Sequence, residues 1–167
     1  TTKKINYIKF DDVHKHIRKT AGEPLTKNEQ EQYESVTGSL QWVARVAKLE
    51  SLVAVSKLQQ MKKKATVAAA VFANKIVKFV KKSAKEGLVY RSGVLDWTLG
   101  SFVIGNVGDA SHADEDCEKT GEPFRSQGGR LTILATPSLL EGDDCGFHVI
   151  SFASNTLKRV CLSTLQA

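Results

Sequence analysis

The hydrophobic periodicity of this 167-residue chain changes from helical to alternating near Gly93, and this change most constrains its fold. Upstream, apolar residues recur at helical spacing and so share one helix face: Tyr33, Val36, Leu40 and Val43. Downstream, three segments have the composition of strands and are separated by turn residues: about 98–107, 130–136 and 147–153. The pattern predicts an α+β fold with a helical subdomain over residues 26–93 and a sheet over residues 94–167.

Start and stop signals place three helices in the first part. Thr26 and Glu29 have the spacing of a capping box, in which each residue satisfies a backbone donor of the other. A second helix is expected over about residues 49–61, followed by a lysine-containing loop at residues 62–64. Thr66 then caps a third helix that is expected to end near Glu86, before Gly87.

The first 25 residues have no sustained periodicity. Residues 5–10 resemble a short strand, and residues 21–24 contain the Gly and Pro of a structure breaker. We therefore expect this lead-in segment, residues 1–25, to belong to an upstream domain.

Charge is divided unevenly along the chain. The net charge is +6, but residues 41–91 hold twelve Lys and Arg against two acidic residues, whereas residues 96–148 hold three against ten. The basic part includes lysines along one face of the third helix and a lysine run before it: Lys75, Lys78, Lys82, Lys85, Lys62, Lys63 and Lys64. These lysines predict a surface that contacts nucleic-acid phosphates, with a merely solvated helix face as the alternative.

Asp109 follows a β-branched run and is expected at the end of the first strand, on the same face as Val107. A carboxylate held there is a possible ligand for Mg²⁺, although Asp is also common in ordinary turns. Two-metal hydrolysis of a phosphodiester needs several carboxylates, and this strand supplies one. Asp114 and Asp116 are expected in a solvated acidic loop.

Other functional classes are less well supported by the residues. His112, Cys117, Cys145 and His148 provide four possible zinc ligands, but their spacing matches no common zinc module. The three cysteines are too few for a disulfide scaffold and fit a reducing compartment. No apolar run approaches the roughly 20 residues of a membrane span, and the first residues lack a signal-peptide core. We expect no membrane partner and a cytoplasmic or nuclear location.

Eight short segments within residues 25–167 resemble, in order, segments of copia-type LTR retrotransposon polyproteins. Residues 34–45 are similar to the signature Y-x-S-x-x-G-S-L-x-W-L-A of that family. The remaining matches are residues 54–59, 73–76, 87–90, 109–113, 124–129, 150–154 and 158–167. The order of the eight segments makes the resemblance specific, although no single segment is decisive.

The resemblance implies that residues 26–90 are the thumb and connection end of a reverse transcriptase. Residues from about 97 would then open a ribonuclease H-like domain with a mixed sheet, of which residues 94–167 are the N-terminal portion. Asp109 matches the first metal-binding and catalytic Asp of that family, with Mg²⁺ as the cofactor and RNA–DNA hybrid or DNA as the partner. The family's next catalytic Glu would follow residues 165–167, so we expect this chain to be inactive alone and completed by the remainder of the polyprotein.

One departure from the family affects the expected fold, and two further interpretations of function stay open. The family's Thr-Arg-Pro-Asp turn is replaced by Ala-Lys-Leu-Glu at residues 47–50. Without the Pro, the first two helices are expected to run together or to bend gently. Functionally, the chain is alternatively a non-enzymatic nucleic-acid-binding remnant that uses residues 62–85, or a pseudogene product without function.

Overall fold

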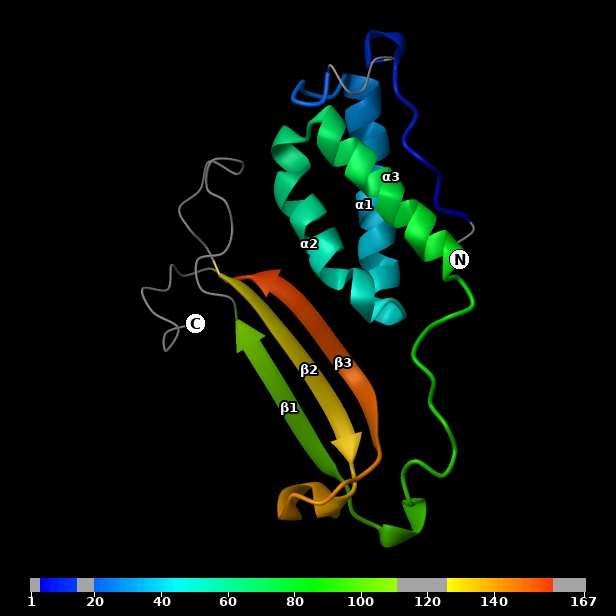
Figure 1. The fold of residues 1–167 in the computed structure, drawn as a ribbon, viewed down its shortest axis with the longest axis vertical. Coiled ribbons are helices and arrows are strands. Elements are labelled where there is room, and N and C mark those ends of the chain that lie inside the picture. Colours follow the sequence, from blue (N-terminus) through cyan, green and yellow to red (C-terminus); the bar gives the residue numbers. More distant parts are fainter. Residues whose placement is uncertain (1–3, 15–19, 111–125, 158–167) are drawn as a thin grey trace. The chain divides into compact units, whose positions relative to one another are not determined.

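The computed structural model of the chain describes residues 4–14, 20–110 and 126–157 (Figure 1). The chain divides into two compact units, Thr1–Gly87 and Leu88–Ala167. Within the described ranges, unit 1 contains three α-helices and unit 2 contains a three-stranded antiparallel sheet. The α+β class is confirmed. None of the helices described is long and apolar enough to cross a bilayer.

The first helix, α1 (Lys27–Val46), begins at the predicted capping box. The Glu29 amide donates to Thr26 Oγ1 at 3.2 Å, and the Thr26 amide donates to the Glu29 carboxylate at 3.0 Å. Two donors of the first turn are thereby satisfied within the helix start itself. The predicted apolar face is buried: Tyr33, Val36, Leu40 and Val43.

The prediction that the first two helices run together or bend gently is wrong, because non-helical residues separate them. Ala47 and Lys48 leave the helical conformation, a short 3₁₀ turn (Leu49–Ser51) follows, and α2 spans Leu52–Gln60. The Lys48 side chain is 1% exposed and its Nζ donates to the carbonyl of Ser83, the C-cap residue of α3 (Val67–Lys82). A cation is stabilised at a helix C-terminus because the last carbonyls lack partners there. This buried interaction gives the chain a stop that needs no Pro.

The third helix begins as predicted but ends earlier. Thr66 is the N-cap, and its hydroxyl accepts from the Ala69 amide at 3.4 Å. The helix ends at Lys82 instead of near Glu86 because Ser83 becomes the C-cap, with its hydroxyl donating to the Phe79 carbonyl at 3.0 Å. The lysine run before α3 forms a 3₁₀ turn, Met61–Lys64, instead of a loop.

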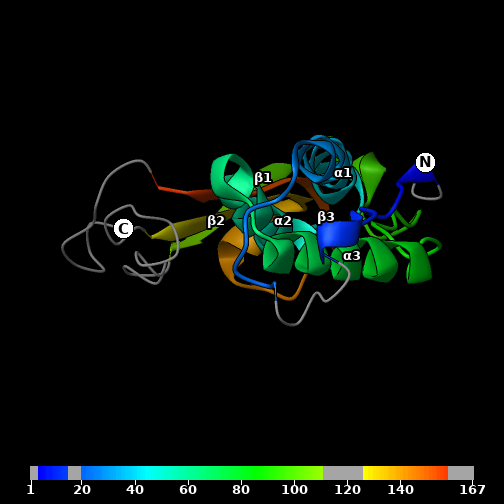
Figure 2. The same cartoon turned by 90° about the horizontal axis from the view of Figure 1, so that it is seen from above.

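The three helices of unit 1 enclose an apolar core. Figure 2 shows α1 nearly end-on, with α2 and α3 on the same side of it, and each pair of helices is in contact. Tyr33 is fully buried, and its hydroxyl donates to the Leu58 carbonyl of α2 at 2.8 Å. Burial raises the pKa of the Tyr33 hydroxyl because an ionised oxygen would lose its hydration there. The neutral hydroxyl therefore links α1 to α2.

The lead-in segment is part of unit 1. Its residues 5–10 are extended but form no strand, and Ile5 and Ile8 are buried. The carbonyls of Glu23 and Ala21 accept from the first two amides of α3, at 3.0 and 2.9 Å. Those amides have no acceptor within the helix, so α3 needs this segment to satisfy its N-terminus.

Glu29 joins the lead-in segment to α1. Its carboxylate is fully buried and accepts from the Asp11 amide at 2.8 Å and from the Thr26 amide. His14 Nδ1, in the 3₁₀ turn Asp12–His14, lies 2.7 Å from Glu29 Oε2. A buried carboxylate is tolerated only when its oxygens are hydrogen-bonded. Among the described residues, the partners of Glu29 beyond the capping box, Asp11 and His14, come from the lead-in segment.

Unit 2 contains β1 (Val103–Ala110), β2 (Gln127–Ala135) and β3 (Phe147–Thr156), in the order β1-β2-β3. The three predicted strands are confirmed with shifted ends. The first starts late because Asp96 caps a 3₁₀ turn, Trp97–Leu99, with the Thr98 amide donating to its Oδ1 at 2.9 Å. The described strands pair only in the antiparallel sense, whereas a mixed sheet was expected, and residues 88–93 form no strand.

Close packing fixes one face of this sheet. Gly105 faces Ile133 across the ladder, and a Cβ at Gly105 would lie 3.0 Å from Ile133 Cγ1. Leu139, in the 3₁₀ helix Pro137–Glu141 between β2 and β3, is also within contact distance of that position. The connection between β2 and β3 therefore contains this 3₁₀ helix, and residues 142–146 complete it.

We expect Glu29→Ala to lower the free energy of unfolding of unit 1 by about 3 kcal/mol, because it removes the acceptor of a buried histidine and two amides. Urea unfolding followed by far-UV circular dichroism measures this loss. Glu31→Ala is the matched control, since Glu31 is exposed on the same helix and its removal should cost less than about 0.5 kcal/mol. Equal losses for the two variants would contradict the role assigned to Glu29.

Candidate nucleic-acid interface

The solvent-exposed side of α3 carries Lys75, Lys78 and Lys82, which we call the basic face. Their spacing of three and four residues places them within one stripe of the helix. The opposite side is buried, including Ala73, Ile76, Val77 and Val80. Among the described residues, no carboxylate lies within ion-pair distance of these three lysines. The basic face therefore presents uncompensated charge to solvent.

The other predicted lysines differ from this arrangement. Lys85 was predicted to lie on the same helix face, but α3 ends at Lys82. Lys85 is exposed and lies in the turn after the helix. Lys62 forms an ion pair with Glu34 of α1 at 3.4 Å, and the two side chains are 44% and 46% exposed. A hydrogen bond from Gln30 and the nearby Lys62 ammonium lower the pKa of Glu34. Lys62 is thus partly neutralised, whereas Lys63 and Lys64 are exposed.

The lysines form two groups along the length of α3. Lys63 and Lys64 precede its first turn, whereas Lys78 lies eleven residues after Val67. A helix rises about 1.5 Å per residue, so Lys78 is about 16 Å further along the axis. Such a separation allows phosphates at different positions along one nucleic-acid backbone to be contacted.

Two exposed aromatic residues border the basic face, and sequence reasoning missed them. Phe72 is 39% and Phe79 46% exposed. Along α3 these rings alternate with two lysines, in the order Phe72, Lys75, Phe79, Lys82. The signal in the sequence was the spacing of seven residues between the two phenylalanines, which places them on the same side of the helix as the lysines. Exposed rings beside cations provide both stacking surfaces and phosphate contacts.

The Phe79 ring lines a groove between the start of α2 and α3. The groove has a volume of about 320 Å³ and is also lined by Glu50, Ser51, Ala54, Lys75 and Ile76. Glu50 also lies 3.7 Å from the buried Lys48 Nζ, so its charge is directed in part toward the helix junction.

Asp109 lies in β1 one residue before the strand ends and pairs with Gly129 of β2. It is exposed and shares a face with Val107, as predicted, and its Oδ1 accepts from the amide of Ala110 at 2.8 Å. The described part of the chain contains no group of three or more His, Cys, Asp or Glu side chains that could hold a metal. Asp109 alone does not fit a two-metal centre, which needs carboxylates on both ions.

The zinc alternative is also incomplete within the described residues. His112 and Cys117 lie outside them, as do Asp114 and Asp116 of the acidic loop. The Cys145 thiol is free, and the His148 ring packs edge-on against Tyr90 with 5.2 Å between ring centroids. Tyr90 also donates its hydroxyl to the Val149 carbonyl at 2.6 Å. His148 therefore has a structural contact that needs no metal.

Comparison of the chain with known proteins found no similarity that assigns it to a family. No protein-family model, no curated protein and no solved structure matches it.

We expect residues 1–167 to show no hydrolysis of the RNA strand of an RNA–DNA hybrid in Mg²⁺ or Mn²⁺, because one exposed carboxylate holds a hydrated ion only weakly. A fluorophore-labelled hybrid measures the reaction. Asp109→Asn is the matched control because it removes charge with little change of shape, and both proteins should stay at background. Metal-dependent hydrolysis by the wild type that Asp109→Asn abolishes would contradict this expectation.

Proposed function

We propose that unit 1 binds the phosphate backbone of nucleic acid through the basic face of α3. The observation that carries this proposal is the arrangement of Lys75, Lys78 and Lys82 on one exposed helix side, where none of them forms an ion pair with a carboxylate of the described residues. Neutralising phosphates with lysines releases counterions, which favours binding irrespective of sequence. RNA–DNA hybrid or DNA is the proposed partner.

We further propose that the chain is part of a copia-type retrotransposon polyprotein, with residues 26–90 from the end of its reverse transcriptase. The ordered sequence segments support this proposal. The helices of unit 1 are compatible with it. Unit 2 is also compatible with it, because its sheet begins with a strand, β1, that carries an acidic residue near its end and pairs antiparallel with β2. In this proposal Asp109 is the first ligand of an Mg²⁺-dependent ribonuclease H-like site.

The second candidate function is a non-enzymatic nucleic-acid-binding remnant. It is compatible with the described residues, which contain no group of three or more His, Cys, Asp or Glu side chains that could hold a metal ion. The two candidates share the basic face and differ only in whether unit 2 takes part in catalysis.

Replacement of Lys78 and Lys82 by Glu should weaken hybrid binding and reduce the slope of log affinity against log salt by about two, because each lysine neutralises about one phosphate. Fluorescence anisotropy with labelled hybrid at several salt concentrations measures both quantities. The wild type should bind hybrids of different sequence with similar affinity, since phosphate contacts carry no sequence information.

The control is Lys27→Glu/Arg45→Glu, which changes the net charge equally at exposed positions of α1 away from the basic face. It should retain most of the wild-type salt slope. Equal loss in both double variants would mean that net charge, and not the basic face, determines binding. No loss in Lys78→Glu/Lys82→Glu would refute the proposed function.

A further inference from the structure

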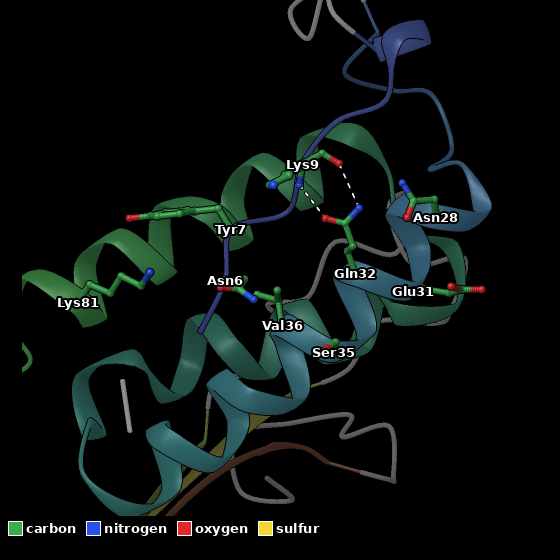
Figure 3. Close-up of a pocket in the computed structure, with 9 residues that line it drawn as sticks. All are labelled: Asn6, Tyr7, Lys9, Asn28, Glu31, Gln32, Ser35, Val36 and Lys81. Atoms are coloured by element: carbon green, nitrogen blue, oxygen red, sulfur yellow. Dashed lines mark hydrogen bonds between the residues drawn. The ribbon is translucent and has the colours of Figure 1, made fainter. Parts of the chain in front are cut away.

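An open pocket of about 700 Å³ lies in unit 1 between the lead-in segment, α1 and the last turn of α3 (Figure 3). Figure 3 shows Tyr7 and Lys81 at one end of the pocket and Asn28 and Glu31 at the other. The volume lies within the range of about 300–1,000 Å³ that is common for ligand sites. We call this cavity the Tyr7 pocket.

The backbone that carries Tyr7 is held by side-chain amides from two helices. Gln32 of α1 accepts from the Lys9 amide at 2.9 Å and donates to the Lys9 carbonyl at 3.4 Å (Figure 3). Asn74 of α3 does the same for Ile8, at 2.8 and 3.0 Å. Since Ile8 is also buried, the segment beside Tyr7 is ordered before any ligand arrives, which lowers the entropic cost of binding.

The Tyr7 ring combines an accessible aromatic surface with a nearby cation. Tyr7 is 43% exposed, and Lys81 Nζ lies over one face of the ring, 4.6 Å from its centroid, which leaves the opposite face for a stacked base. Lys9 lines the same pocket. Aromatic rings stack with nucleobases irrespective of base identity, and adjacent lysines contact the connecting phosphates.

The Tyr7 pocket adjoins the basic face of α3. Lys81 is next to Lys82 in the sequence and one helical turn from Lys78, so the three lysines occupy adjoining positions on the surface of the helix. A strand that follows the basic face therefore reaches the Tyr7 ring without leaving lysine contacts.

We propose that the Tyr7 pocket binds an unpaired nucleotide of single-stranded nucleic acid, with the base stacked on Tyr7 and its phosphates on Lys81 and Lys9. The inference rests on the proposed nucleic-acid binding by α3 and adds a preference for unpaired bases. A paired base within a duplex is stacked on its neighbours and does not offer its face to Tyr7. Glu31 repels phosphate and lies at the far end, which directs the phosphates to the lysine end.

The test measures binding of the full chain to labelled oligothymidylate, to an abasic oligonucleotide of equal length and to a duplex. Tyr7→Ala should weaken oligothymidylate binding about 5- to 150-fold, the range expected for one stacked base. Its affinity for the duplex and for the abasic strand should stay at the wild-type value, because these ligands place no base on Tyr7. Tyr7→Phe keeps the ring and should bind oligothymidylate nearly as the wild type does.

A second variant tests the pocket without changing Tyr7. Ser35 is exposed on α1 and lines the cavity, so Ser35→Trp should fill part of it and weaken oligothymidylate binding while duplex binding is retained. Wild-type oligothymidylate affinity in both Tyr7→Ala and Ser35→Trp would overturn the inference. If that result is accompanied by loss of all binding in Lys78→Glu/Lys82→Glu, the proposed function stands and only the Tyr7 pocket is refuted.

Discussion

The buried carboxylate of Glu29 is the constraint on which the arrangement of unit 1 depends. It completes the capping box of α1 and also accepts from Asp11 and lies against His14, so helix initiation and the docking of the lead-in segment are coupled. A buried polar group must be matched by hydrogen bonds, and a side chain without an acceptor oxygen at this position would leave the Asp11 and Thr26 amides unsatisfied. The docked segment then supplies acceptors for the first amides of α3 and positions Tyr7 beside Lys81. The same contact thus supports both the helical core and the proposed nucleotide pocket.

The structure separates the cations of the basic part of the chain by role. Lys48 is buried against the C-terminal end of α3, where it stops α1 and holds the helices together. Lys62 pairs with Glu34 and joins α1 to the turn before α3. The lysines that remain on the exposed side of α3 have no comparable contacts among the described residues, and two phenylalanines lie beside them. Net charge in the sequence therefore overstates the charge available to a polyanion, and position on α3 is the more informative quantity.

Local signals in the sequence predicted the helices and strands. The features that were not predicted depend on contacts between residues far apart in the sequence. The capping box at Thr26, the buried face of α1, the presence of α2 and the three strands follow from local sequence patterns alone. The turn at Lys48 does not, because its partner is a carbonyl 35 residues away. The docking of the lead-in segment was missed for the same reason: Asn74 is 66 residues from Ile8, and neither residue has an unusual local pattern. Of the candidate site, the basic face was predicted, whereas Tyr7 depends on a contact between segments distant in sequence.

The central claim is that unit 1 contacts nucleic acid through the exposed side of α3. The most direct measurement is a titration of the isotope-labelled full chain with an RNA–DNA hybrid, followed by amide chemical shifts in two-dimensional NMR spectra. The account predicts concentration-dependent shifts at Lys75, Lys78 and Lys82 and their neighbours, which diminish as salt is added. Shifts confined to the strands of unit 2, or spectra unchanged at saturating hybrid and low salt, would contradict it.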